Sequence, residues 1–316
     1  MSIRLAVVGA GFMGANHARV LAELPSAELV AVIDRDEQRA RRAADEFGCA
    51  WATSVMEVSG RVRAAIVATP TETHRELALE AIEAGLDTLV EKPLAPSVDE
   101  AEEVVSAAEK AGTVLAVGHV ERFNPACLDL PRFVSEPVFI QTRRISPFTD
   151  RVHEGVVRDM MIHDLDIVLW LAGSVPARVT ADLAASRSST EDLAAATVVF
   201  ESGLVAQLVA TRVGQDKVRR VDVIEHDCVV NVDLMRQQIT IVRQATAEYP
   251  STGVRRFKEA SVREIPYLEH RGEPLWLELT DFVTALNDGR APLVDGRAGV
   301  AALDLCERIL AAGARD

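Results

Sequence analysis

The chain has 316 residues, of which 48% are hydrophobic and 26% are charged, and its formal net charge is −14. This composition is that of an ordinary globular protein, and the length favours two domains because single cores rarely grow beyond about 250–300 residues. The acidic balance argues against a nucleic-acid partner or an anionic membrane surface, since both need clustered lysine and arginine.

The cysteines and the hydropathy pattern bear on where the protein works. Cys49, Cys127, Cys228 and Cys306 form no CxxC pair and are too sparse for a disulfide framework or a zinc site. The N-terminal apolar stretch is too short for a signal peptide, and no apolar run of about 18 residues follows it. We therefore expect a cytoplasmic protein with reduced thiols and no membrane span.

Short apolar runs alternate with helical patterns over the first 120 residues, which is typical of a parallel sheet with crossover helices. Helices are expected at about 14–24, 36–47, 73–84 and 98–111. The expected strands are Ile3–Val8, Leu29–Asp34, Ala64–Ala68, Thr88–Glu91 and Val114–Gly118. The pattern predicts an α/β fold whose N-terminal domain, residues 1–121, is a doubly wound Rossmann domain.

Strand-like segments dominate from about residue 137 to 267, with one helix at about 159–172 and two closing helices at about 273–288 and 296–312. Residues 122–316 are therefore predicted to form an α+β domain for substrate binding and oligomerisation, built on a large, mostly antiparallel, open-faced sheet. Alternating Val, Leu and Ile on the open face would suit a homodimer or homotetramer interface. The stretch Ala245–Glu259 has no period and is expected to be a flexible loop.

A GxGxxG motif follows the first strand and opens the first helix. Its glycines permit a tight turn and close backbone approach to a pyrophosphate, and the helix N-terminus supplies free N–H donors. Asp34 lies twenty positions after the last of these glycines, where a carboxylate would bind the ribose 2′-hydroxyl of NAD. The predicted cofactor-binding residues of the loop are Gly9, Gly11, Phe12, Met13 and Gly14.

The nature of the dinucleotide depends on two adjacent residues. Asp34 would repel a 2′-phosphate, which favours NAD over NADP. Arg35 could instead accommodate that phosphate, so NADP remains an alternative cofactor.

Two further segments fall at the carboxyl ends of predicted strands, where open parallel sheets bind their ligands: Thr69-Pro70 and Glu91-Lys92-Pro93. Lys92 should therefore point towards the nicotinamide half of the cofactor. Its ammonium could hydrogen-bond a substrate hydroxyl and stabilise developing alkoxide charge. Position alone does not distinguish this role from a chance three-residue match.

Asp159 and His163 are four apart on a predicted helix and hence share a face, with Asp166 one turn further on. A carboxylate beside an imidazole stabilises the imidazolium, which suits a general base that takes a proton from a hydroxyl. Spacing alone favours an ordinary surface His–Asp pair. A metal site of His119, His153 and His163 is a weaker alternative, because their spacings match no usual ligand pattern, and no metal is predicted.

At these residues the chain resembles the Gfo/Idh/MocA family of NAD(P)-dependent sugar and polyol oxidoreductases. The resemblance covers nearly the whole length, and the order and spacing of its motifs make it specific. The motifs are GxGxxG at 9–14, Ala68–His74, EKP at 91–93, Gly118–Pro125, Asp159–Asp166 and Pro292–Leu310.

The resemblance implies roles for particular residues. Lys92 would reach both substrate and nicotinamide, His163 would be the general acid/base, and Asp159 would be its partner. His17 matches a recurrent family histidine, although a histidine on an amphipathic helix more often packs or hydrogen-bonds locally. The residues implied to lie near the cofactor are Thr69, Pro70, His74, Glu91 and Lys92.

The segment Gly118–Pro125 departs from the commonest family pattern, which has an aromatic residue at position 119 and a basic one at 121. It looks more like the branch acting on UDP-N-acetylglucosamine than like inositol dehydrogenases. The residues suggested to contact substrate are His119, Glu121, Asn124 and Asp166.

The expected function is hydride transfer between nicotinamide and a secondary hydroxyl of a sugar, nucleotide-sugar or cyclic polyol. One alternative is an enzyme that retains NAD and uses transient oxidation to hydrolyse or epimerise a glycoside. The other is a non-catalytic NAD(P)-binding regulator. Lys92, Asp159 and His163 argue against a regulator, because a sensor needs no lysine or acid–imidazole pair beside the nicotinamide.

Overall fold

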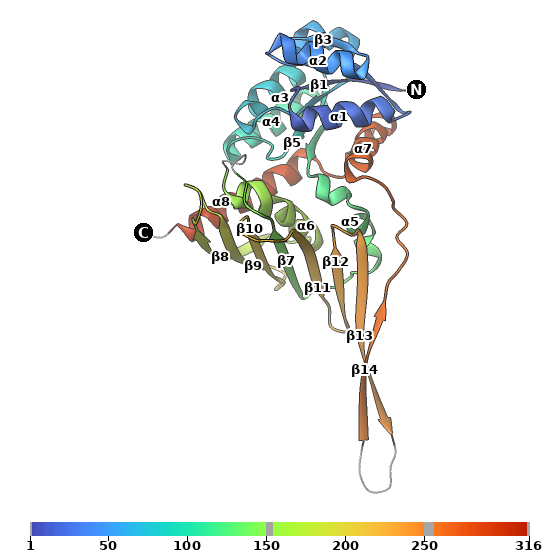
Figure 1. Cartoon of the computed structure of the whole chain (residues 1–316), viewed down its shortest axis with the longest axis vertical. Helices are drawn as coiled ribbons and strands as arrows, with labels where there is room; N and C mark the ends of the chain where they lie inside the picture. The colour runs from blue at the N-terminus through green and yellow to red at the C-terminus, as the bar shows by residue number, and fades with distance from the viewer. Residues whose placement is uncertain (1, 150–153, 250–255, 315–316) are drawn as a thin grey trace. The chain divides into compact units, whose positions relative to one another are not determined.

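The structure, a computed structural model, describes residues 2–149, 154–249 and 256–314 (Figure 1). Contacts divide the chain into two compact units. The first is Met1–Phe123 with Gly272–Asp304, and the second is Asn124–Arg271 with Leu305–Asp316.

The first unit contains a six-stranded parallel sheet in the order β3-β2-β1-β4-β5-β6, which confirms the predicted doubly wound fold. Strand order reverses between β1 and β4, so ligands are expected at the carboxyl ends of these strands. The crossover helices are α1 (Phe12–Glu23), α2 (Glu37–Phe47), α3 (His74–Glu83) and α4 (Val98–Ala111). The strands are β1 (Ile3–Val8), β2 (Ala27–Ile33), β3 (Ala50–Ala52), β4 (Ala64–Val67), β5 (Asp87–Glu91) and β6 (Leu115–Gly118).

Helix α7 (Pro274–Asp288) also belongs to the first unit, although the sequence prediction assigned residues 122–316 to the second domain. Leu279, Phe282 and Val283 are buried in the same core as Leu5 and Val7 of β1. Burial of an amphipathic face against the Rossmann core therefore brings residues 272–304 back to the first unit. The contact-defined units differ from the predicted ranges 1–121 and 122–316 mainly in this segment.

The second unit is built on an eight-stranded sheet in the order β14-β13-β12-β11-β7-β10-β9-β8. Its neighbouring strands are antiparallel except for the parallel pair β7 and β10, which confirms the predicted mostly antiparallel sheet. The strands are β7 (Phe139–Ile145), β8 (Pro176–Ala184), β9 (Leu193–Phe200), β10 (Val205–Thr211), β11 (Val218–Ile224), β12 (Cys228–Asp233), β13 (Gln238–Tyr249) and β14 (Arg256–Glu264).

Helices cover one face of this sheet. The α5 helix (Pro125–Asp129) contacts β12, the π-helical turn η6 (Val157–Met161) contacts β10, and α6 (Ile162–Ala172) contacts β7. The last helix, α8 (Gly296–Gly313), contributes its first part to the first unit and its end to the second. Among the described residues, no helix combines the length and hydropathy needed to cross a bilayer.

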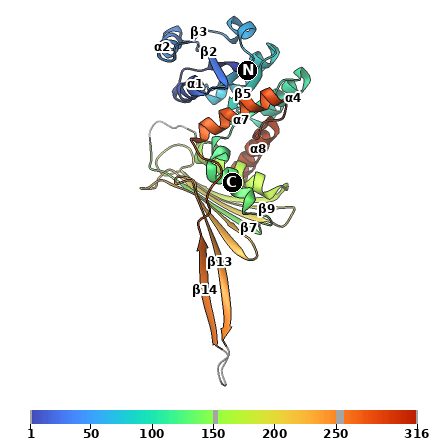
Figure 2. The ribbon, with the colours of Figure 1, turned by 90° about the vertical axis from the view of Figure 1, so that its right-hand side faces the viewer.

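The predicted flexible loop Ala245–Glu259 is wrong where the structure describes it. Residues 245–249 belong to β13 and 256–259 to β14, which pair antiparallel and project from the sheet as a hairpin (Figures 1 and 2). These residues are strands because their backbones pair with one another, and backbone pairing does not require a period-two pattern of side chains. Residues 250–255 lie outside the described residues.

Candidate active site

The glycine-rich loop connects β1 to α1. Gly9 has φ +103, a conformation that favours glycine, and a Cβ on Gly14 would lie 1.7 Å from the Gly9 carbonyl oxygen. A Cβ on Gly11, by contrast, would meet no heavy atom within 4 Å. Gly11 is the N-cap of α1 and provides no side-chain cap. The loop therefore leaves an open space beside a helix N-terminus, which fits a dinucleotide pyrophosphate.

Asp34 follows β2 and accepts a hydrogen bond from this loop. One carboxylate oxygen accepts a hydrogen bond from the Ala10 N–H at 2.9 Å, and the other accepts from the Asp36 N–H at 2.9 Å. Carboxylate oxygens have further lone pairs, so Asp34 can still bind a ribose hydroxyl. The acid thus supports the glycine loop as well as facing the predicted ribose position.

A cavity of about 470 Å³ lies beside the loop within the first unit. Six predicted cofactor residues line it: Gly9, Gly11, Asp34, Arg35, Thr69 and Pro70. Phe12, Met13, Gly14, His74, Glu91 and Lys92 are not among its lining residues. The sequence prediction missed the lining residues Arg39, Thr53, Ser54, Val55, Thr73, Glu76, Leu77 and Glu80, most of which lie around α2, β3 and α3 and are brought here only by the fold.

His74 is buried at the start of α3 rather than directed into this cavity. Its Nδ1 lies 2.8 Å from the Pro93 carbonyl oxygen and its Nε2 lies 2.8 Å from the Thr69 carbonyl oxygen. The imidazole therefore connects the segments that follow β4 and β5, at the carboxyl ends of these strands.

Glu91 ends β5 and is buried, while Lys92 is half-buried. The Glu91 Oε1 atom lies 2.7 Å from Nε2 of His17, and Oε2 accepts a hydrogen bond from the Lys92 N–H at 3.2 Å. Burial raises the pKa of Glu91, but the hydrogen bond with His17 and the nearby positive charge of Lys92 outweigh it and hold the pKa below its usual value. Glu91 is thus a carboxylate at neutral pH.

The acid–imidazole pair lies in the second unit. His163 and Asp166 are in α6, as predicted, whereas Asp159 lies in the π-helical turn η6 that precedes it. The spacing of four no longer implies a shared face across this turn, because π-helical bonds span five residues. The pairing of Asp159 with His163 therefore stays a prediction. Ile162, Leu165 and Val168 of α6 are fully buried, whereas Leu169 is only half-buried.

A buried ion pair fastens α6 to the sheet beside His163. Asp164, the next residue, accepts hydrogen bonds from Arg144 of β7, with Nη2 to Oδ1 at 2.7 Å and Nε to both oxygens at 3.1 Å. Both side chains are at most 4% exposed, so separating them would leave a buried charge without its partner. Sequence patterns gave no signal for this pair, because its members lie on elements of different period.

The proposed substrate residues divide between the two units. His119 and Glu121 are buried just after β6, in the first unit. Asn124 caps α5 in the second unit, where its Oδ1 accepts from the Ala126 N–H and its Nδ2 donates to the Leu234 carbonyl at 2.8 Å. The amide of Asn124 therefore has a structural task, and its contact with substrate stays a prediction.

The alternative metal set cannot be assembled from the described residues, because His153 lies outside them. A different group, Glu225 and Asp227 of the turn after β11 and Cys228 at the start of β12, has potential ligand atoms within 4.8 Å of one another. Glu225 is already engaged, since its Oε1 accepts from the backbone N–H groups of Ser135 and Glu136. Burial raises the pKa of the Cys228 thiol, which disfavours the thiolate that would bind a metal.

A Rossmann sheet with a glycine cradle, an acid at the end of β2 and an adjoining cavity defines a dinucleotide-binding domain of the oxidoreductase type. Comparison with known proteins gives the family. Residues 3–119 match the model of an oxidoreductase family with an NAD-binding Rossmann fold, and residues 137–226 match the GFO/IDH/MocA C-terminal domain. The chain therefore belongs to the GFO/IDH/MocA family of oxidoreductases, and its cofactor is NAD.

Relatives match over almost the whole chain. A UDP-N-acetylglucosamine 3-dehydrogenase from Acidithiobacillus ferrooxidans is 32% identical, covering 94% of this chain and 93% of that protein. A scyllo-inositol 2-dehydrogenase (NAD(+)) from Bacillus subtilis is 29% identical, covering 92% and 88%. A solved structure of the Acidithiobacillus enzyme matches with a TM-score of 0.89 at 31% identity, covering 99% of this chain and 97% of that one.

Proposed function

We propose that this protein is an NAD-dependent dehydrogenase that oxidises a secondary hydroxyl of a sugar, with UDP-N-acetylglucosamine as the first candidate substrate. The observation that carries the proposal is the glycine cradle with Asp34, in a chain similar over 94% of its length to an enzyme named for that reaction. The same groups would serve the reverse reaction, reduction of a keto-sugar. The likeness to scyllo-inositol 2-dehydrogenase supports a cyclic polyol as the next substrate to test.

The residues divide the chemistry between them. NAD, held by the glycine loop and Asp34, would supply the hydride acceptor. His163, oriented and stabilised as an imidazolium by Asp159, takes the hydroxyl proton as the hydride leaves. Lys92 donates a hydrogen bond to the same oxygen and stabilises its developing negative charge. His119, Glu121, Asn124 and Asp166 are proposed to shape the substrate pocket.

A substrate panel tests this proposal. UDP-N-acetylglucosamine, scyllo-inositol, myo-inositol and free aldoses are incubated with NAD or NADP, and NADH absorbance and products are recorded. We expect NADH to appear with one class and with a ketone product. Product formation without net NADH would instead indicate an enzyme that retains NAD for hydrolysis or epimerisation. Tight NAD binding with no turnover on any substrate would indicate a regulator.

The preference for NAD over NADP is proposed to depend on Asp34. Asp34→Ser removes the charge that would repel a 2′-phosphate, while Arg35 and Arg39 line the same cavity and can bind that phosphate. We expect the ratio of NAD to NADP affinity to fall about tenfold or more, which corresponds to about 1.4 kcal/mol. NADH and NADPH fluorescence titrations measure it. Because Asp34 also accepts from Ala10, some loss of NAD affinity should accompany the change.

An equal preference in the variant and the parent would contradict this role of Asp34. Glu28→Ser, at an exposed position on β2, is the matched control for removing an acid and should change neither affinity.

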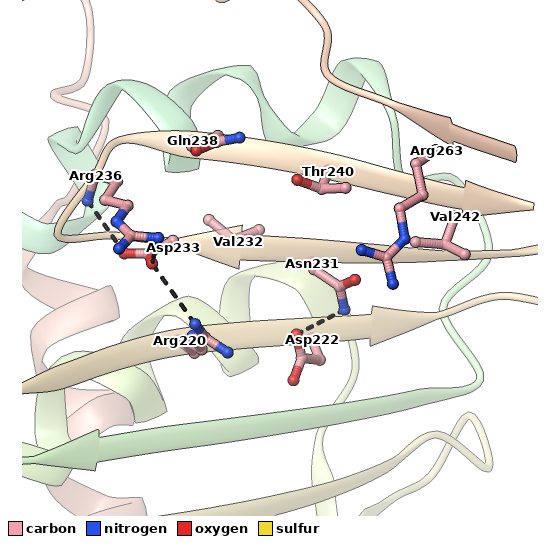
Figure 3. Close-up of a pocket in the computed structure, with 10 residues that line it drawn as sticks. All are labelled: Arg220, Asp222, Asn231, Val232, Asp233, Arg236, Gln238, Thr240, Val242 and Arg263. Carbon is pink, nitrogen blue, oxygen red and sulfur yellow. Dashed lines mark hydrogen bonds and ion pairs between the residues drawn. The ribbon is translucent and has the colours of Figure 1, made fainter.

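We also propose a homodimer or homotetramer that associates through the sheet of the second unit. The sequence predicted an open face of alternating Val, Leu and Ile, but across β11, β12 and β13 this face carries mainly polar residues (Figure 3). They line a groove of about 410 Å³. In this groove Oδ2 of Asp233 lies 3.9 Å from Nη2 of Arg220 and 4.0 Å from Nη1 of Arg236. A face that carries both signs of charge is suited to pairing with its own copy about a two-fold axis.

The hairpin supports the same proposal. Residues 244–249 of β13 continue beyond the last residue that pairs with β12, and they pair with β14 as a two-stranded ribbon. A two-stranded ribbon is marginally stable in water unless something covers it. Light scattering at micromolar protein should give a multiple of the 34.2 kDa chain mass. A mass of one chain would contradict the proposal.

The free cysteines support our further proposal of a cytoplasmic location.

A further inference from the structure

A buried contact joins α1 to β5 inside the first unit. His17 is fully buried in the middle of α1, and its Nε2 lies 2.7 Å from Oε1 of Glu91, which is 74 positions further along the chain. A polar pair at this depth costs free energy unless its members satisfy one another. The contact is therefore specific, because neither group could turn to water if the other were moved.

The other side of Glu91 faces the predicted catalytic lysine. Oε2 of Glu91 accepts the backbone N–H of Lys92 at 3.2 Å. Gly118 of β6 lies beside Glu91 in the sheet, and a Cβ there would come within 3.1 Å of the carboxyl group. The neighbouring strand thus leaves just enough room for this carboxylate, which is confined between α1, β6 and the backbone of Lys92.

These contacts form a continuous connection between two parts of the proposed active site. The glycine loop that fits the pyrophosphate opens α1, His17 lies in the same helix, and Glu91 connects His17 to Lys92. We propose that His17 is a positioning residue for hydride transfer. Through the Glu91 carboxylate it fixes the position of Lys92 relative to the cofactor. This inference rests on the proposed catalytic role of Lys92.

Positioning makes a different prediction from packing. A residue that only stabilises the core would change the fraction of folded protein, but each folded molecule would turn over normally. A residue that places Lys92 would change kcat while the glycine loop still binds NADH. Misplacement of a reacting group by about 1 Å can cost on the order of 100-fold in rate.

Two variants of similar chemistry separate these cases. His17→Gln carries an amide nitrogen at about the reach of Nε2 and can keep the bond to Glu91, whereas His17→Asn falls short of it. We expect His17→Asn to lower kcat per folded enzyme about 10–100-fold, with the NADH dissociation constant within about threefold of the parent. His17→Gln should recover most of the loss. His226→Ala, at an exposed position in the turn after β11, should behave as the parent.

A second readout does not depend on turnover. Acetic anhydride labels the Lys92 amine at a rate that depends on pH and surroundings, and mass spectrometry of the peptide containing Lys92 follows it. His17→Asn should change the labelling profile of Lys92, and His17→Gln should return it to that of the parent. If neither His17 variant folds, Glu91→Gln replaces them and should lower kcat with NADH affinity retained.

The outcomes distinguish this inference from the proposed function. Parent-like kcat and labelling in His17→Asn, an equal loss in both His17 variants, or parent-like kcat in Glu91→Gln would overturn the positioning role. If Lys92→Met leaves turnover unchanged, the catalytic role of Lys92 fails. In that case an altered labelling profile in His17→Asn would still show that His17 holds Lys92.

Discussion

Lys92→Met is expected to lower kcat by about 10²–10⁴-fold, while the dissociation constant of NADH changes little. Methionine keeps much of the length of the side chain but removes the charge and the hydrogen-bond donors. Lys92 lies at the carboxyl end of β5, where the switch-point geometry of the sheet places ligands, but it does not line the cavity beside the glycine loop. Its loss should therefore affect the reacting oxygen rather than the binding of the dinucleotide.

Single-turnover kinetics and NADH titration, both on the substrate found in the panel, measure these two quantities. Lys110→Met is the matched control, because Lys110 is exposed near the end of α4 and should leave both values unchanged. A parallel change, His163→Ala, should lower kcat by a similar factor, because it removes the proposed general base. If Lys92→Met and His163→Ala both turned over like the parent, the proposed chemistry would be wrong.

Local signals explain what could be predicted from the sequence. The Rossmann strands and helices have clear periods, and the GxGxxG motif and Asp34 belong to one short βαβ stretch, so their arrangement follows from neighbouring residues. The structure confirms this fold and places six of the predicted cofactor residues around one cavity. The β3 strand was missed because its three residues are too few to show a period.

Partners that are distant in sequence explain what could not be predicted. The α7 helix has an ordinary amphipathic pattern, which does not say which core it joins. The sequence motifs include His17 and Glu91, but no local pattern predicts that their side chains are in contact. The same holds for Arg144 and Asp164. The outer parts of β13 and β14 are defined by backbone pairing with one another, which needs no alternating apolar pattern in the sequence, so this stretch was predicted as a loop.

Gly14→Ala should be the most damaging single-methyl change in the cofactor domain. The added Cβ would lie 1.7 Å from the Gly9 carbonyl oxygen, and a backbone atom cannot move aside as a flexible side chain would. Overpacking costs typically about 1–3 kcal/mol, and this contact should reach at least the upper end. The strain should also push the glycine loop away from α1, so NADH binding should weaken by at least about tenfold, or about 1.4 kcal/mol.

Gly11→Ala is the matched variant that separates strain from ligand exclusion. Gly11 has φ −81, which alanine adopts, and its added Cβ would meet no heavy atom within 4 Å. The unfolding free energy should therefore change by less than about 1 kcal/mol, the usual cost of alanine at a helix N-cap. NADH binding should still weaken, because the methyl group would enter the space where the pyrophosphate approaches the backbone. Thermal melting and NADH fluorescence measure the two effects. A Gly11→Ala protein that binds NADH like the parent would place the pyrophosphate elsewhere, and a Gly14→Ala protein that melts like the parent would contradict the close contact between loop and helix.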